Sequence, residues 1–304
     1  MKIYVSGSAG CGKTTFINKL KEEVFYQDVN IIEQPVSIRR DLFGLHKLKA
    51  PSMVQKAEEH SQEDVEVYLQ KLIDWQLILL HSHYVNTFET AFSVNNTRNA
   101  VYILDRCSLD SLAYFLVDLH ILHHEAGIVA ERTGTELHPI ILELLNINLS
   151  QAVKEVMEGL IYTYSQDIER GLEMTRRAVN EFFMSPFRLA KKSQECINTY
   201  VNKITYILYE NFRIVMDTHA FYFILTRNPH KDLEDDGVRI IEKRLSDMIE
   251  NTYLDIYKNI DERFVPTIKK MWLENRDKEV RSAIACVDIN NRLQWGCNHL
   301  SIGL

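Results

Sequence analysis

The chain has 304 residues, a formal net charge of −7 at pH 7 and a hydrophobic fraction of 46%. This composition is typical of a folded globular protein and excludes a disordered or fibrous chain. The acidic balance provides no global positive field, so nucleic acid is disfavoured as a partner and no membrane partner is expected. Any anionic substrate must therefore be captured by local groups.

The amino-terminal residues, the lengths of the apolar runs and the cysteines are considered for the cellular compartment. Residues 1–5 show no export signal, and no apolar run approaches the roughly 18 residues of a membrane span. The five cysteines have no metal-binding spacing, and Cys11 lies in a glycine-rich loop where a disulfide would interfere. We expect a reducing, cytoplasmic location, in a cell or in a virus-infected cell.

Apolar periodicity predicts strands that alternate with helices. Short apolar runs predict strands at residues 3–5, 31–32, 101–104, 221–225 and 283–287. Apolar residues every three or four positions predict helices at residues 14–24, 62–92 (one helix or two), 109–122 and 242–257. The alternation predicts an α/β fold with a parallel sheet and helices on both of its faces.

Residues 123–220 are almost entirely helix-compatible and lie between two predicted strands. We interpret them as a large helical insertion within a single domain, 1–304, because the strands on both sides belong to one sheet. The insertion either encloses a substrate or forms an oligomer interface, such as that of a homodimer. A polar stretch with helix breakers, 226–240, predicts a lid.

A glycine-rich octapeptide, residues 7–14, fits the pattern Gly-x-x-x-x-Gly-Lys-Thr between a predicted strand and a predicted helix. In that context the pattern binds the phosphates of a nucleoside triphosphate. Main-chain N–H groups converge on the phosphates, the lysine reaches their oxygens and the threonine binds Mg²⁺. The expected cofactor-binding residues are Gly7, Ser8, Ala9, Gly10, Cys11, Gly12, Lys13, Thr14 and Thr15.

Charged residues follow two of the predicted strands. Asp105 ends the third strand, where a carboxylate can meet Mg²⁺, and the adjacent Arg106 offers a planar fork for phosphate. Glu33 follows the second strand, where it either accepts a proton from an attacking hydroxyl, holds an acceptor group or caps a neighbouring segment. Arg39 and Arg40 are weaker candidates for binding acceptor anions.

The predicted lid carries two candidate catalytic cations. Arg227 and Arg239 bracket its acidic centre. Phosphoryl transfer requires cations that neutralise the departing charge and a cover that excludes water. We therefore expect these arginines to reach the transferred phosphate.

Trp75 and Gln76 lie in the long predicted helix 62–92. Their side chains either contact a nucleobase, by stacking and hydrogen bonding, or form part of the core. The first interpretation makes both residues candidate substrate-binding groups.

The segment Asp105–Tyr114 resembles the Asp-Arg signature of thymidylate kinases, including its Ser-Leu-Ala-Tyr ending. Glu33-Gln34-Pro35 is similar to the Glu-Pro element after the second strand of thymidylate and deoxynucleoside kinases. Residues 233–239 resemble a lid element of a broader set of P-loop kinases that includes nicotinamide-riboside kinases. The resemblance implies a P-loop NTPase-type sheet of five parallel strands, an arginine-bearing lid, and ATP and Mg²⁺ as cofactors.

In those families the acceptor is a deoxynucleoside or its monophosphate, and Asp105 and Arg106 would lie at the acceptor and phosphate site. We therefore expect transfer of the γ-phosphoryl group of ATP to a deoxynucleoside monophosphate, catalysed by positioning and charge neutralisation. In the nearest alternative, a deoxynucleoside kinase, Glu33 is the general base for a 5′-hydroxyl.

Two further alternatives remain at this stage. A kinase of a modified base or of a nucleic-acid end is kept open by the basic residues Arg170, Arg176, Arg177, Arg188, Lys191 and Lys192. A nucleotide-dependent switch is the other, although the chain lacks a guanine-reading Asn-Lys-x-Asp motif.

Overall fold

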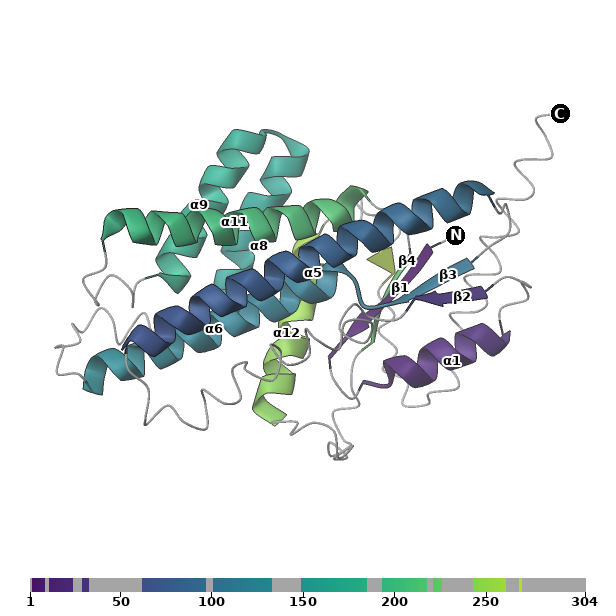
Figure 1. Cartoon of the computed structure of the whole chain (residues 1–304), viewed down its shortest axis with the longest axis horizontal. Helices are drawn as coiled ribbons and strands as arrows, with labels where there is room; N and C mark the ends of the chain where they lie inside the picture. Colours follow the sequence, from purple (N-terminus) through teal and green to yellow (C-terminus); the bar gives the residue numbers. More distant parts are fainter. Residues whose placement is uncertain are drawn as a thin grey trace.

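The computed structural model describes residues 2–8, 11–23, 29–32, 62–96, 101–132, 149–184, 193–217, 221–225, 243–260 and 268–269. Within these residues a parallel sheet has the strand order β2-β3-β1-β4-β5 (Figure 1). The strands are β1 (Lys2–Gly7), β2 (Val29–Ile32), β3 (Val101–Asp105), β4 (Phe221–Leu225) and the two-residue β5 (Ile268–Lys269). The predicted α/β fold with a parallel sheet is therefore confirmed, whereas the predicted strand 283–287 lies outside the described residues.

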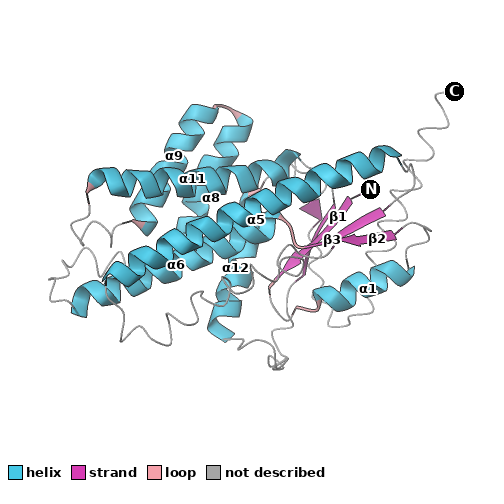
Figure 2. Ribbon diagram, viewed as in Figure 1, coloured by secondary structure: helices cyan, strands magenta, loops and turns pink. Residues whose placement is uncertain are grey.

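Most of the described chain is helical (Figure 2). The helices are α1 (Lys13–Glu23), α5 (Gln62–Asn96), α6 (Ser108–Arg132), α8 (Leu149–Ser165), α9 (Ile168–Phe183), α11 (Gln194–Asp217) and α12 (Lys243–Asn259). The stretch predicted as one helix or two is one helix, α5. None of the described helices combines the length and the apolar character needed to cross a lipid bilayer.

Alternate residues of the strands face two different layers, as the period of two in a strand requires. On one face, the core shared with α5, α6, α8, α9, α11 and α12 contains Tyr4, Tyr102, Leu104, Tyr222 and Ile224. On the other face, the core shared with α1 contains Ile3, Val5, Val101, Ile103, Phe223 and Leu225. Helices therefore lie on both faces of the sheet, with α1 on the side opposite to α5 and α6 (Figure 1).

The register of β1 determines what meets at the carboxyl edge of the sheet. Val5 is paired with Asp105 of β3, and Gly7 with Leu225 of β4. The chain moves from β1 out to β2, returns to β3 and only then crosses to β4 on the other side of β1. Such a reversal leaves a crevice at the carboxyl ends of the strands, where ligands of open α/β sheets bind.

The predicted insertion forms a helical layer that packs on α5, α6 and α12. Its helices α8 and α9 cross closely, since a Cβ atom on Gly159 would lie 2.4 Å from Thr175 Oγ1 and one on Gly171 2.4 Å from Thr163 N. Helix α6 continues past the predicted boundary at residue 123, as far as Arg132. A role for this layer in enclosing substrate or forming a homodimer stays a prediction.

Candidate functional site

The predicted phosphate loop connects β1 to α1. Gly7 has φ 143° and Gly12 has φ 88°, a region that L-residues with a side chain rarely adopt. A Cβ atom on Gly7 would also lie 2.4 Å from the Leu225 carbonyl oxygen. Glycine is therefore needed where β1 turns into the loop, both for the backbone angle and for the close approach of β4.

Lys13, the first residue of α1, lies across the loop. Its Nζ donates hydrogen bonds to the carbonyl oxygens of Gly7 (2.8 Å) and Ser8 (2.7 Å), and only 8% of the residue is exposed. Thr14 and Thr15 are exposed in the first turn of the same helix. The ammonium group and the unsatisfied N–H groups of this helix end create positive potential beside the loop.

Asp105 and Arg106 lie half-buried at the end of β3, next to β1. Arg106 has φ 73°, the one positive φ among the described non-glycine residues. Its peptide N–H donates to the Val5 carbonyl oxygen at 3.1 Å, and its guanidinium carbon lies 5.2 Å from the centre of the Tyr114 ring. The predicted acceptor-side pair is thus at the same sheet edge as the loop.

The surroundings of Arg106 are anionic and aromatic. Burial by itself lowers the pKa of its guanidinium, but Tyr114, Asp110, Tyr253 and Asp105 together raise that pKa above its ordinary value. The side chain therefore stays charged at any physiological pH. It is a permanent cation at the carboxyl edge of the sheet.

Asp110 was not identified from the sequence, yet three groups donate hydrogen bonds to it. Ser6 Oγ and the Cys107 peptide N–H donate to Oδ2, both at 2.8 Å, and the Tyr253 hydroxyl donates to Oδ1 at 2.5 Å. Burial and the nearby Asp110 raise the pKa of Tyr253 well above its ordinary value, so the hydroxyl keeps its proton. The segment Asp105–Tyr114 contained Asp110, but no sequence signal indicated Tyr253 as its partner.

Helix α5 places a second group of polar side chains in its buried face. Gln76 is 0% exposed, and neither its Nε2 nor its Oε1 has a hydrogen-bond partner among the described residues. Trp75 beside it is 3% exposed. Leaving a buried amide unpaired is costly, so a ligand that pairs with Gln76 would gain affinity.

His83 lies two helical turns after Gln76, on the same face of α5. Its Nε2 is 2.8 Å from Ser111 Oγ of α6. Burial lowers the pKa of His83 to about 4, although the nearby Asp110 opposes this shift. A neutral imidazole and a hydroxyl thus form a polar contact between α5 and α6, close to Asp110. Neither residue could be predicted from the sequence, because single polar positions carry no pattern.

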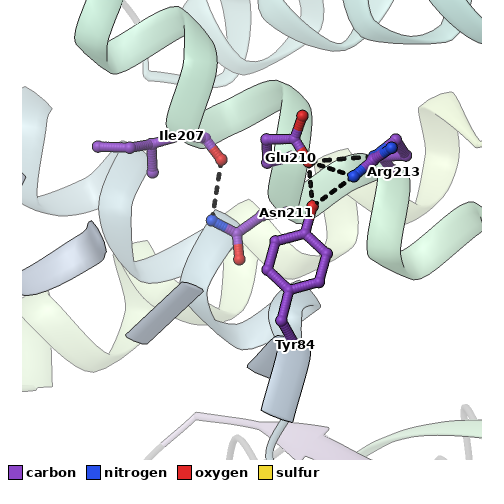
Figure 3. A network of polar contacts seen from close by, with 5 residues as sticks. All are labelled: Tyr84, Ile207, Glu210, Asn211 and Arg213. Carbon is purple, nitrogen blue, oxygen red and sulfur yellow. Dashed lines mark hydrogen bonds and ion pairs between the residues drawn. The ribbon is translucent and has the colours of Figure 1, made fainter. Parts of the chain in front are cut away.

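Polar contacts at two points tie α5 to α11. Tyr84 donates to the Glu210 carboxylate, and Arg213 donates to Tyr84 Oη at 2.7 Å and to Glu210 Oε2 at 3.0 Å (Figure 3). Burial and Glu210 raise the pKa of Tyr84 to about 12, which keeps the phenol a donor. Toward the start of α5, Tyr200 Oη donates to Glu66 at 3.1 Å. These contacts with α11 therefore hold in place the face of α5 that carries Gln76.

Several predicted site residues cannot be placed. Those that lie outside the described residues are Ala9, Gly10, Glu33, Arg39, Arg40, Arg227 and Arg239, together with the whole predicted lid 226–240. β2 ends at Ile32, which pairs with Leu104 of β3. In the sequence, Glu33 directly follows Ile32, and Asp105 directly follows Leu104. Their roles stay predictions.

The arginines of α9 do not form an uninterrupted basic surface. Arg176 lies 3.3 Å from Glu173, and Arg177 lies 3.9 Å from Glu181. Arg170 lies over the Tyr162 ring at 5.4 Å. The described part of the basic cluster is thus mixed with acidic groups, while Arg188, Lys191 and Lys192 are outside the described residues.

The described residues of the candidate site include oxygen donors of the kind that Mg²⁺ prefers. Among them, no group of three or more His, Cys, Asp and Glu side chains could hold a metal ion without other ligands. Mg²⁺ that is bound with a triphosphate needs only one or two protein oxygens in addition to phosphates and waters. The Thr14 hydroxyl and the Asp105 carboxylate are suitable groups for this purpose.

No protein-family model matches the chain, and no curated protein matches its sequence. The site residues therefore carry the functional inference.

Proposed function

We propose that the chain is an ATP-dependent kinase with a P-loop fold, which transfers the γ-phosphoryl group to a deoxynucleoside monophosphate or to a deoxynucleoside. The observation that carries the proposal is the position of Lys13, whose ammonium group binds two carbonyl oxygens of a loop that has positive-φ glycines on both sides. This geometry keeps the cation at the loop and its first helical turn, where phosphates bind in P-loop proteins.

The sheet topology supports the same assignment. β1 is the central strand, the loop follows it directly, and the strand order reverses beside it. The loop, Asp105 and Arg106 are thereby assembled at the crevice of the sheet. A nucleotide bound there would have its phosphates at the N-terminus of α1 and its acceptor on the β3 side.

Catalysis in this proposal relies on positioning and charge. ATP would supply the phosphoryl group, and Thr14 and Asp105 would hold a Mg²⁺ ion that reduces the repulsion between phosphate charges. Lys13 neutralises negative charge at the loop, and main-chain N–H groups of the loop and of α1 orient the phosphates. Arg106 provides a fixed cation on the acceptor side.

Gln76 supports an acceptor that carries a nucleobase. A primary amide presents one acceptor and two donors in a plane, which matches the hydrogen-bonding edge of a base. Its Oε1 and Nε2 are buried without partners in the described part of the chain. An acceptor without such an edge would leave the buried Gln76 amide unpaired.

The two acceptors would use different residues. A hydroxyl acceptor, as in a deoxynucleoside, needs a carboxylate to accept its proton, the role that Glu33 would take. A monophosphate acceptor needs a cation to orient its phosphate, the role that Arg106 would take.

An acceptor screen tests the proposal. The protein is incubated with Mg²⁺ and ATP labelled in the γ-phosphate, together with each deoxynucleoside, each monophosphate or an oligonucleotide with a 5′-hydroxyl. We expect transfer that depends on the acceptor, with a preference of about tenfold or more for one small-molecule class. Phosphate release to water at one rate with and without acceptors would indicate a switch instead, and selective labelling of the oligonucleotide would indicate a nucleic-acid kinase.

A further inference from the structure

Main-chain hydrogen bonds on both sides hold the strained backbone of Arg106. A non-glycine residue at φ 73° is uncommon and persists where its surroundings enforce it. On one side the Arg106 N–H donates to the Val5 carbonyl oxygen at 3.1 Å, and on the other the Cys107 N–H donates to Asp110 Oδ2 at 2.8 Å. Asp110 therefore restrains the peptide that directly follows Arg106.

The same carboxylate ends a series of contacts that begins at the Arg106 side chain. The guanidinium lies 5.2 Å from the Tyr114 ring, and that ring meets the Tyr253 ring edge to face, with centres 6.4 Å apart. The Tyr253 hydroxyl returns to Asp110 Oδ1 at 2.5 Å. We call Arg106, Asp110, Tyr114 and Tyr253 the Arg106 cage.

Helix capping explains only part of this arrangement. Asp110 lies in the first turn of α6, and its bond to the Cys107 N–H resembles the reciprocal bond of a capping box. Capping needs neither Tyr253, which is 143 residues away, nor Ser6, which is 104 residues away. These distant donors bind one to each carboxylate oxygen and hold the carboxylate in one orientation.

Helix α12 contacts both halves of the candidate site. Its Tyr253 binds Asp110 behind the Asp-Arg turn, and its Glu250 accepts a hydrogen bond from Ser8 Oγ of the phosphate loop at 3.3 Å. The two residues lie on one face, three positions apart. A displacement of α12 would therefore disturb the loop and the cage together.

We propose that Asp110 and Tyr253 are positioning residues that hold Arg106 in its strained conformation for binding the acceptor. The acceptor-binding role of Arg106 rests on the proposed kinase function, whereas the contacts of the Arg106 cage do not depend on that function. Neither residue touches the reacting atoms. Both act through Arg106.

A double-mutant cycle tests the cage without any assay of activity. Tyr253→Phe removes one hydroxyl and keeps the ring against Tyr114, while Arg106→Met removes the charge and keeps an unbranched side chain. We expect their effects on the unfolding equilibrium constant to be coupled by about fivefold or more. Additive effects would overturn the cage; if Arg106→Met does not fold, Arg106→Lys takes its place in the cycle.

A kinetic comparison tests the positioning role. Tyr253→Phe is expected to raise KM for the acceptor about tenfold and to change KM for ATP less than twofold. The matched control is Tyr222→Phe, which removes a buried hydroxyl bonded to the Val215 carbonyl oxygen away from the cage, and we expect it to change neither KM. An unchanged acceptor KM in an active Tyr253→Phe enzyme would overturn the role.

The two tests separate this inference from the function. If the effects are coupled but the protein shows no acceptor-dependent transfer, the Arg106 cage is supported. The kinase proposal is then rejected, and the positioning role is rejected with it. If the protein is an active kinase but the effects are additive, the kinase proposal is supported and the Arg106 cage is rejected.

Discussion

The predicted phosphate loop and the Arg106 cage lie at neighbouring strand ends but are assembled in different ways. In the loop, Lys13 binds carbonyl oxygens five and six residues away, so the contact is contained in one short motif. In the cage, Asp110 binds donors 104 and 143 residues away, from β1 and α12. The first can be read from eight consecutive residues, whereas the second exists only after the sheet and the helices have packed.

The two regions should also differ in how activity and stability respond to substitution. Lys13 can lose its charge while the cores on both faces of the sheet remain intact. The polar groups near the cage are buried among α5, α6 and α12, so their removal changes the folded state itself. The predictions below test this contrast, beginning with the largest expected effect.

Lys13→Ala should abolish phosphoryl transfer, by roughly 10³-fold or more, because a cation that neutralises the transferred phosphate is lost. The fold should be retained. Transfer from labelled ATP and the circular dichroism spectrum measure the two effects, with Lys21→Ala, an exposed lysine at the end of α1, as the control. Transfer retained in Lys13→Ala would refute the assigned role.

Gly7→Ala should lower the free energy of unfolding by about 3 kcal/mol, since the new Cβ atom meets the Leu225 carbonyl oxygen in a backbone region that disfavours side chains. Urea denaturation provides the measurement. Ser8→Ala at the next position removes one hydrogen bond to Glu250 and should cost about 1 kcal/mol. Equal effects of the two substitutions would contradict the steric requirement at Gly7.

His83 should make the protein sensitive to acid. Its pKa is about 4 in the folded state and 6.5 in the unfolded chain, so the unfolded state binds the proton first as pH falls. Stability is lost between these two values, by up to about 3 kcal/mol. His83→Gln should remove this loss from the pH profile of urea denaturation, whereas His81→Gln, on the exposed side of α5, should keep it.

Gln76→Leu should separate binding from stability. We expect KM for the acceptor to rise roughly tenfold to a hundredfold, because the group proposed to bind the base is lost. The free energy of unfolding of the free protein should rise by about 1 kcal/mol, since a buried unpaired amide is removed. Gln70→Leu makes the same change at a half-buried position of α5, where the amide has a partner in Asp74. If it changes the acceptor KM equally, Gln76 has no specific role.

Sequence periodicity predicted most elements because the faces of strands and helices are patterned locally. The strand at 221–225 was predicted with the bounds found, α5 begins at the predicted residue and extends beyond the predicted end, and α1 and α12 differ from their predicted ranges by one or two residues at each end. α6 was predicted to end at residue 122 but extends to Arg132. β5, with two residues, is too short to carry any periodicity, and it was not predicted.

Site residues could be predicted where neighbours in sequence are neighbours in space. Lys13, Asp105 and Arg106 were identified as candidates in this way, since a loop and a strand end define their own surroundings. His83, Ser111 and Tyr253 were missed because each is an ordinary residue at an ordinary helical position. Each gains its proposed role from a hydrogen-bond partner on another helix.

The sequence by itself determined the alternation of strands and helices, the glycine loop and the identity of the charged groups at the strand ends. These features follow from local sterics, hydrogen bonding and hydrophobic periodicity, which act over a few residues. Only the tertiary structure decided the strand order, the burial of Gln76 and the series of contacts that begins at Arg106. The reason is that a buried polar group gains its partner from a segment distant in sequence, and packing of the whole core selects that segment.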